Sequence, residues 1–502
     1  MDTIFDKYIN EVNATETILF TGEVIRVNGM LIESRGPQSI VGELCTIHIP
    51  SENTDVFAEV VGFDGTTVKL MAYGETKGIE VGCKVTGSGA LLQVGVGKNL
   101  LGRVIDATGK AYDRKGEIVP EAYYPAVASP PDPLDRTPIT ERIITGVRSI
   151  DSLCAVGKGQ RLGIFAGSGV GKSTLMGMIA RNTNADINVI ALIGERGREV
   201  LDFIQKDLGE EGLKRSVVVV ATSDQSPLCR LRGAYVATAV AEYFRDQGKD
   251  VMLMFDNITR FARAQREIGL ASGEPPAQRG YTPSVFETMP KLLERSGTSS
   301  KGTITAFYAV LVDGDDMDEP ISDTVRGILD GHIVLNRKLA QAYHYPAVDV
   351  LASISRLANR VSGAETKRAV AAVRRLMAVY VENEDMITVG AYQKGSNPDV
   401  DAAIDSHKAI EAFLIQDEFE KAPVRDTLKA LGALAGVEIP EDELVAAEGA
   451  ASASERASVS ASASVGSADS GANGAEAGIA GASSAGSANG SGARALSGNL
   501  TN

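Results

Sequence analysis

Hydrophobic residues change their spacing several times along the chain. In residues 18–90, short runs rich in β-branched residues, such as GELCTIHI and TTVKLMAY, are separated by turn sequences such as VNG and FDG. Short strands at this close spacing predict a small β-barrel. Residues 1–17 precede it and predict a short helix, which either packs on its own domain or docks on a partner. Its apolar stripe consists of Ile4, Phe5, Tyr8, Ile9 and Val12.

Residues 140–365 follow a different pattern. Nearly continuous apolar runs, among them INVIALIG, SVVVVATS and DVMLMFD, alternate with helical stretches such as AYVATAVAEYFRDQG. Strands that are covered on both faces need such runs, so this segment predicts an α/β domain on a mostly parallel sheet. Because the Pro-rich stretch ASPPDPLDRTP lies just before it, we expect residues 91–139 to form a linker region.

Two long segments with helical periodicity follow, AETKRAVAAVRRLMAVYVENEDM and DAAIDSHKAIEAFLIQ. They predict a small α-helical C-terminal domain over residues 366–445. Residues 446–502 consist mainly of Ala, Ser and Gly. Such a segment buries too little apolar surface to offset its ordering entropy, so we expect a disordered low-complexity tail.

Composition narrows the class of protein. The 502 residues include 50 Lys and Arg and 65 Asp and Glu, a net charge of −15. This balance counts against a nucleic-acid partner, because a phosphate backbone needs a basic footprint. The four cysteines are scattered without CxxC spacing and indicate neither a zinc cluster nor a disulfide framework. No apolar run is long enough to span a membrane and the N-terminus is acidic, so we expect a cytoplasmic protein.

The strongest chemical signal is AGSGVGKST, which lies between the strand-like GQRLGIF and a helical stretch. This setting distinguishes a phosphate-binding loop from a structural glycine turn. Glycines let backbone N–H groups converge on phosphate oxygens, and the following helix adds its dipole. The strict motif has Gly at the first position, where this chain has another small residue. The predicted nucleotide-binding residues of the loop are Ala166, Gly167, Ser168, Gly169, Val170, Gly171, Lys172, Ser173 and Thr174.

Within this loop, we expect Lys172 to reach the β- and γ-phosphates and the Ser173 hydroxyl to ligate Mg²⁺. Two carboxylates follow apolar strands and so belong at the same sheet edge. Asp256 ends VMLMFD and either holds a Mg²⁺-bound water or caps a helix. Glu195, in IGERGREV, either polarises the attacking water with Arg196 beside it or belongs to a surface ion-pair cluster.

An arginine is suited to stabilise the charge on a transferring phosphoryl group. Arg356 and Arg360 both lie near the end of YPAVDVLASISRLANR, and their spacing does not choose between them.

Taken together, GIFAGSGVGKSTL, ALIGERGREV, MLMFDNITRFARAQREIG and YPAVDVLASISR resemble the nucleotide-binding core of the rotary ATP synthase catalytic subunits in order and spacing. The chain is most similar to their relatives, the type III protein export ATPases, and among those to the flagellum-specific members. The resemblance covers residues 18–440. It implies a RecA-like P-loop domain and an enzyme that hydrolyses ATP with Mg²⁺ to energise delivery of export substrates to a membrane gate.

The resemblance also implies roles for single residues. Glu195 takes the place of the glutamate that activates water, and Asp256 that of the Mg²⁺ ligand. Arg196 and Arg260 match arginines that approach the γ-phosphate. Arg356 matches the finger that reaches the neighbouring subunit's nucleotide. Two aromatic residues match the adenine pocket, with plain core packing as the alternative for each, namely Tyr345 and Phe413.

Because Glu195 and Arg356 occur in one sequence, a single chain can supply both halves of an inter-subunit site. This predicts a homo-oligomer, most simply a six-membered ring. The resemblance implies further partners: a stator-like regulator at the N-terminal helix, a central stalk protein facing residues 274–281, export substrates and their chaperones. Contact with the inner face of the cell membrane would be peripheral.

Four alternatives stay open from the sequence. An injectisome export ATPase shares every catalytic residue. An ATP synthase subunit fits less well, because that machine needs two different ring chains. An RNA translocase is suggested by DNITRFARA, which is similar to the transcription terminator Rho, but the acidic balance counts against it. A non-hydrolysing nucleotide-sensing scaffold would have no need of Glu195.

Overall fold

The computed structural model describes residues 20–449 apart from 313 and 315. Its first element is a closed barrel in the order β1-β2-β5-β4-β3-β6. In β3, alternate residues such as Cys45, Ile47 and Ile49 are buried, as a barrel wall requires. The strand-like runs GEVIRV, GELCTIHI, DVFAEVVGF, TTVKLMAY and CKVTGSG predicted every strand of the barrel except β2. The strands are β1 (Thr21–Asn28), β2 (Leu31–Arg35), β3 (Glu43–Ile49), β4 (Thr54–Asp64), β5 (Thr67–Ala72) and β6 (Lys84–Leu91).

The central sheet has nine strands, in the order β19-β18-β12-β17-β15-β13-β14-β8 with β16 paired to β17. All pairs are parallel except those of β16 and β19. The strands are β8 (Val104–Asp106), β12 (Arg161–Ala166), β13 (Ile187–Ile193), β14 (Ser216–Ala221), β15 (Asp250–Asp256), β16 (Gly297–Thr298), β17 (Thr303–Leu311), β18 (Gly331–Leu335) and β19 (Val348–Ser355).

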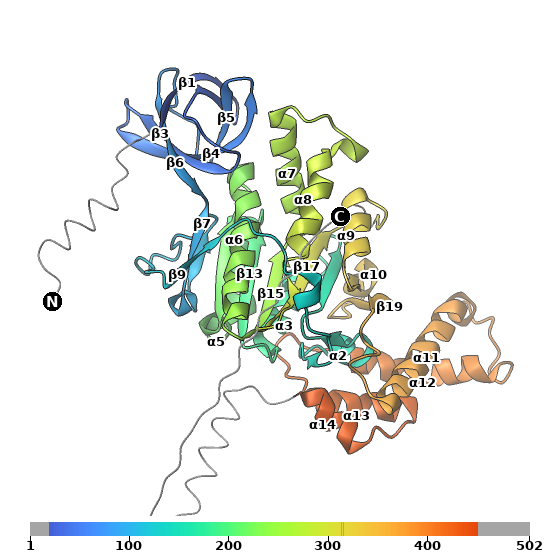
Figure 1. Cartoon of the computed structure of the whole chain (residues 1–502). Coiled ribbons are helices and arrows are strands. Elements are labelled where there is room, and N and C mark those ends of the chain that lie inside the picture. Colours follow the sequence, from blue (N-terminus) through green and yellow to red (C-terminus); the bar gives the residue numbers. More distant parts are fainter. Residues whose placement is uncertain (1–19, 313, 315, 450–502) are drawn as a thin grey trace, which may run out of the picture. The chain divides into compact units, whose positions relative to one another are not determined.

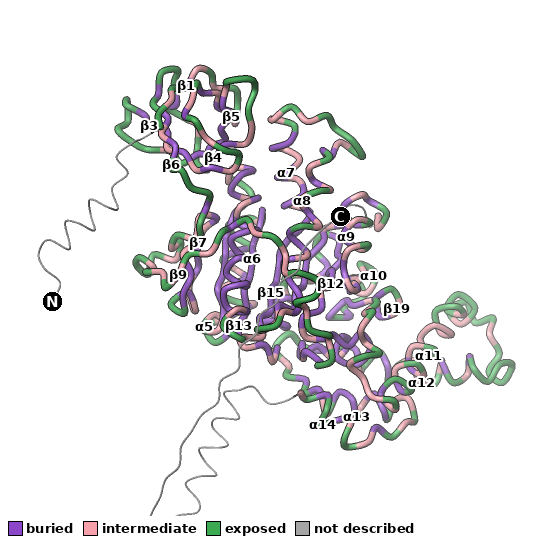
Figure 2. Tube along the Cα trace, viewed as in Figure 1, coloured by how far each residue is buried: buried purple, intermediate pink, exposed green. Residues whose placement is uncertain are grey.

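Helices cover both faces of this sheet (Figure 1). Successive residues of β13 belong to different hydrophobic clusters: Val189 and Ala191 pack toward α6 (Pro227–Asp246) and α7 (Ile258–Ser272), whereas Ile190 and Leu192 pack toward α3 (Lys172–Asn182). Burial on both faces explains why the strands lack alternation in sequence, and Figure 2 shows them buried along their length.

Four helices close the described chain: α11 (Ala364–Thr388), α12 (Pro398–Leu414), α13 (Val424–Ala435) and α14 (Glu441–Glu448). Leu428 and Leu431 of α13 join the hydrophobic cluster on the α3 face. At the start of α11, Glu443 of α14 accepts hydrogen bonds from the backbone N–H groups of Glu365 and Thr366, 2.9 Å each. The predicted fold class, with barrel, mostly parallel α/β domain and C-terminal helices, is confirmed.

The division of the chain into domains stays a prediction. Residues 91–139, expected to be a linker, supply β8 at the edge of the central sheet and the pair β7 (Gln93–Val96) and β9 (Ala122–Pro125). The predicted helix of residues 1–17 and most of the predicted tail lie outside the described residues. In the part of the chain that is described, no helix is long and apolar enough to cross a membrane.

Candidate active site

The phosphate loop lies between β12 and α3, as the sequence predicted. Gly169 and Gly171 have φ angles of 78° and 90°, which other residues adopt only with strain. Gly171 is the N-cap of α3 and has no side chain to accept hydrogen bonds from the first turn. The N–H groups of that turn point toward the loop, as at any helix N-terminus. A cavity of about 590 Å³ opens here, with Gly169, Gly171 and Thr174 in its lining.

Lys172 lies between two carboxylates at the mouth of this loop. Its Nζ donates a short hydrogen bond to Asp256 Oδ1 and lies 3.6 Å from Glu195 Oε1. Burial alone would lower the pKa of Lys172, but the two carboxylates more than offset burial and raise it. The ammonium therefore stays charged where the phosphates of a nucleotide would lie.

The two carboxylates come from neighbouring strands. Asp256 ends β15, Leu192 of β13 is its partner in register, and Glu195 follows β13 after Gly194. Burial, followed by the charge of Asp256, raises the pKa of Glu195 to about 7. A carboxyl group with this pKa is half ionised near neutral pH, which suits a general base.

Arg356 and Lys172 lie at opposite ends of the sheet's strands: Lys172 follows the carboxyl end of β12, whereas Arg356 lies near the amino ends of β12 and β18. β19 runs antiparallel to β18, so Ser355 pairs with Gly331 at the start of β18, and Val348 pairs with Leu335 at its end. The backbone N–H of Arg356 donates to Asp330 O at 3.0 Å. The length of β12 separates this point from the phosphate loop, roughly 17 Å at the usual rise per residue.

Tyr345 comes just before β19, at the edge that holds the phosphate loop. It lines the cavity, and a Cβ atom placed on Gly171 would lie 3.4 Å from its ring. The structure therefore brings Tyr345 together with the loop, where an aromatic ring can stack on a nucleotide base.

The three segments of the chain match known families separately. Residues 146–355 match the nucleotide-binding domain of the ATP synthase alpha/beta family and residues 24–89 match its β-barrel domain. Residues 362–433 match the C-terminal domain of the type III secretion ATPase EscN.

Whole relatives match over most of their length. The chain is 62% identical over 435 residues to the flagellum-specific ATP synthase of Treponema pallidum (strain Nichols), covering 87% of this chain and 97% of that protein. It is 55% identical over 433 residues to that of Bacillus subtilis (strain 168), covering 86% and 98%. The chain belongs to the family of flagellum-specific ATP synthases and type III secretion ATPases.

A solved structure of this ATPase family has the same fold. The assembled ATPase EscN in complex with its central stalk EscO, from the enteropathogenic E. coli type III secretion system, aligns with a TM-score of 0.77 and 44% identity, covering 82% of this chain and all of that chain. The prediction of an ATPase of the flagellar export type is thus confirmed, with the secretion ATPases as relatives.

Two arginines predicted near the γ-phosphate of this ATPase differ in their surroundings. Arg260 packs closely on Gly194, since a Cβ atom there would lie 2.8 Å from Arg260 Cβ. The Arg196 side chain is 75% exposed and its Nη1 lies 3.2 Å from Glu199 Oε1. Arg196 thus forms a surface ion pair, and its approach to the γ-phosphate stays a prediction.

Phe413 is partly buried against the hydrophobic cluster on the α3 face and is not among the residues that line the cavity, so its place in an adenine pocket stays a prediction. Residues 415–418, just after it, line the cavity beside the phosphate loop. A second aromatic residue that the sequence did not single out, Tyr343, also lines this cavity. Tyr343 is 85% exposed and has a φ angle of 58°.

Sequence reasoning also missed Asn257. Its Nδ2 donates to Glu195 Oε1 at 2.7 Å, and its Oδ1 accepts from the backbone N–H of Arg260 at 2.8 Å as the N-cap of α7. The signal was present, because Asp-Asn between an apolar strand and a helical stretch is typical of a capping position. What the sequence does not show is that the same side chain faces the carboxylate of Glu195.

Proposed function

We propose that this ATPase hydrolyses Mg²⁺–ATP by in-line attack of a water molecule that Glu195 activates. The observation that carries the proposal is the cluster of Lys172, Asp256 and Glu195 beside the phosphate loop, with a Glu195 pKa of about 7. Bound phosphates would compete for Lys172 and release the two carboxylates from it. The catalytic parts are then a phosphate-binding cation, a base and a positioning amide.

The residues beside the loop suit Mg²⁺. Ser173 offers a hydroxyl and Asp256 a carboxylate, and Mg²⁺ prefers such hard oxygen ligands together with substrate phosphates and water. Among the described residues no group of three or more His, Cys, Asp or Glu side chains forms a closed metal cage. A site with few protein ligands fits a metal that arrives with the nucleotide. When bound, Mg²⁺ would neutralise charge on the phosphate oxygens.

Each remaining residue has a distinct part in this scheme. Glu195 accepts the proton of the attacking water, and Asn257 holds the Glu195 carboxylate in place through its Nδ2 donor. Lys172 binds the β- and γ-phosphates, and Arg260 approaches the γ-phosphate from α7. Tyr345 stacks on the adenine in the cavity. Arg196 would have to leave its ion pair with Glu199 to reach a phosphate.

Arg356 acts on the nucleotide of a neighbouring subunit in this proposal. An arginine side chain is much shorter than β12, so Arg356 cannot reach the loop of its own chain from the far edge of the sheet. A site completed by a neighbour needs head-to-tail contacts that close into a ring. The assembled state of EscN supports this, and we propose a homohexamer.

The relatives support a proposal for the cellular role. We propose a cytoplasmic enzyme, peripheral to the inner face of the cell membrane, that serves the flagellar export apparatus. Its proposed partners are a stator-like regulator at residues 1–17, a central stalk protein facing residues 274–281, and export substrates with their chaperones. EscN's complex with its stalk EscO supports the stalk partner. We expect no nucleic-acid partner.

The test is ATP hydrolysis and ATP binding by the wild type and Glu195→Gln. We expect Glu195→Gln to bind ATP nearly as tightly as the wild type while turnover falls by about 10²–10⁴-fold, the usual contribution of a general base. Lys172→Ala should lose binding and turnover together. Unimpaired turnover in Glu195→Gln would remove Glu195 from its role. Stimulation of turnover by RNA would favour the translocase alternative.

A further inference from the structure

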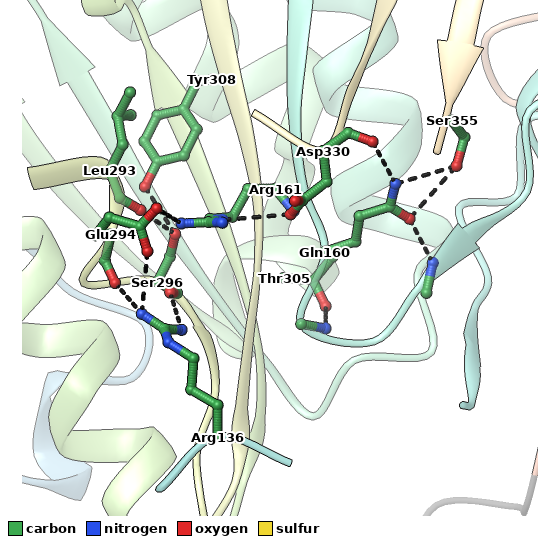
Figure 3. Close-up of polar contacts among 12 residues, drawn as sticks. Arg136, Gln160, Arg161, Leu293, Glu294, Ser296, Thr305, Tyr308, Asp330 and Ser355 are labelled. Atoms are coloured by element: carbon green, nitrogen blue, oxygen red, sulfur yellow. Dashed lines mark hydrogen bonds and ion pairs between the residues drawn. The ribbon is translucent and has the colours of Figure 1, made fainter. Parts of the chain in front are cut away.

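The Gln160 side chain joins several backbone segments at the edge of the sheet where Arg356 lies (Figure 3). Gln160 is fully buried. Its Nε2 donates to Asp330 O at 3.0 Å and lies 3.1 Å from Ser355 Oγ, and its Oε1 accepts from the Gly157 N–H at 2.9 Å. Ser355 Oγ in turn donates to Ala155 O at 2.7 Å. This amide thus binds the backbone of Gly157 and Asp330 and the hydroxyl of Ser355, the last residue of β19.

Asp330 is the shared partner in this arrangement. Its carbonyl oxygen accepts from Gln160 Nε2 and from the backbone N–H of Arg356, 3.0 Å each. Its carboxylate Oδ2 accepts from Arg161 N at 3.1 Å and from Arg161 Nε at 3.3 Å. The next residue, Gly331, has a φ of 148°, and a Cβ atom there would lie 2.3 Å from Ile354 O. The backbones of β18 and β19 therefore approach each other closely just before Arg356.

Ion pairs extend from Arg161 to two further side chains. Arg161 Nη1 lies 2.6 Å from Glu294 Oε1, and Glu294 Oε2 lies 3.4 Å from Arg136 Nη2. Arg136 belongs to the Pro-rich segment that precedes the α/β domain, and its Nη1 donates to Ser296 O at 2.9 Å. Arg161 thus links the Asp330 carboxylate to Glu294 and, through it, to Arg136 (Figure 3).

We infer that Gln160 is a positioning residue for Arg356, acting through Asp330 and Ser355. Arg356 is exposed, while hydrogen bonds from the buried Gln160 amide hold Ser355 directly before it and Asp330 opposite it. A finger that crosses a subunit interface must be held close to its productive geometry, because a displacement of about 1 Å can cost roughly 10²-fold in rate. Gln160 supplies this rigidity from inside the donor subunit. The inference rests on the proposed action of Arg356 on a neighbouring subunit.

A purely structural role for Gln160 predicts a different defect. Gln160 lies just before β12, and the other end of β12 leads into the phosphate loop of the same chain. If Gln160 only supported β12, its loss would impair ATP binding and turnover in its own subunit. If Gln160 positions Arg356, its loss impairs the neighbour's site and leaves its own site intact. The two roles separate when subunits are mixed.

The experiment uses Gln160→Met, which keeps side-chain volume but removes both polar atoms, and Ser355→Ala, which removes only the bridging hydroxyl. We expect each variant alone to lose at least about tenfold in turnover while ATP still binds with near wild-type affinity. Assembled into rings with Glu195→Gln, each should regain turnover, because a Glu195→Gln subunit donates an intact finger to a variant's intact site. Ser355→Ala carries the test if Gln160→Met does not fold.

Two controls make the outcome unambiguous. Thr305→Val lies at the same sheet edge, where Thr305 Oγ1 accepts from Gly159 N at 2.8 Å, and should keep near wild-type turnover. The mixture of Arg356→Ala with Glu195→Gln should regain turnover.

If that mixture does so while the Gln160→Met and Ser355→Ala mixtures stay inactive, Gln160 acts on its own site and the inference is overturned. If no mixture regains activity, the shared site of the proposed function fails as well. Full activity of both variants alone also overturns the inference.

Discussion

Asn257 Nδ2 donates a 2.7 Å hydrogen bond to Glu195 Oε1, while Asn257 Oδ1 caps α7. One side chain therefore fixes both the start of a helix and the orientation of the proposed base. Because the amide presents its donor to Glu195, it favours the ionised carboxylate over the protonated one. Substitutions at this position can separate the helix cap from the effect on Glu195.

Asn257→Asp should retain the cap and lose the donor. A second carboxylate then faces Glu195, which raises the pKa of Glu195 further, and we expect turnover at neutral pH to fall by tenfold or more. Asn257→Ala should in addition lose about 1 kcal/mol of stability with the cap. Paired measurements of turnover and thermal unfolding distinguish the two variants. Equal turnover in Asn257→Asp and the wild type would contradict the proposed contact.

The pH dependence of hydrolysis should report Glu195 directly. A base must be ionised to accept a proton, and the pKa of Glu195 is raised to about 7. We therefore expect kcat/KM for ATP to fall about tenfold for each pH unit below that value, since kcat/KM reports the free enzyme. The profile should be measured between about pH 5.5 and 9, alongside the residual rate of Glu195→Gln, which should lack this limb. A wild-type profile that stays flat to the acid end would exclude Glu195 as the base.

Replacing Lys172 with alanine should destabilise the protein by an amount that depends on pH. In Lys172→Ala, Asp256 and Glu195 lose their shared partner, and uncompensated buried charge costs roughly 3–5 kcal/mol. Lys172 lowers the pKa of Glu195, so without the ammonium that pKa rises further above its usual range. The missing stability should therefore be largest at high pH and shrink as protonation of Glu195 removes its charge at low pH. Urea unfolding without nucleotide near pH 8 and pH 5 measures this, with Lys172→Ala/Glu195→Gln as the partly rescued control. A loss of equal size at both pH values would contradict the charge account.

Tyr343 should cost stability through its backbone. For a residue with a Cβ atom, a φ of 58° destabilises the folded state by about 1 kcal/mol or more. The Tyr343 ring is 85% exposed, so its burial contributes little stabilisation to offset this. We expect Tyr343→Gly to be more stable than Tyr343→Ala by about 1 kcal/mol, measured by chemical unfolding. If the alanine and glycine variants are equally stable, the backbone at this position is not strained in solution.

The fold followed closely from the sequence where local patterns suffice. The phosphate loop was predictable because its glycines and Lys172 are continuous in sequence and flanked by a strand and a helix. The buried strands were predictable because their apolar runs are uninterrupted. β2 was missed because LIESR mixes polar and apolar residues in only five positions. β8 was missed because a three-residue edge strand depends on its neighbour β14 rather than on its own pattern.

The site was harder to predict where contacts join distant segments. Sequence spacing could not choose Arg356 over Arg360, and only the pairing of β19 with β18 places Arg356 beside Asp330. The resemblance placed Arg196 near a phosphate, whereas its side chain forms an ion pair with Glu199 three residues away. Gln160 carried no signal at all, because a buried amide shows its importance only through its partners.

The central claim is that each site combines Glu195 of one subunit with Arg356 of the next. The most direct test is ATP hydrolysis by rings assembled from Glu195→Gln and Arg356→Ala subunits, each nearly inactive alone. In an equimolar mixture about a quarter of the sites pair an intact base with an intact finger, so we expect turnover to rise well above that of either variant. Turnover that stays at the level of the separate variants, in rings shown to contain both chains, would contradict the shared site.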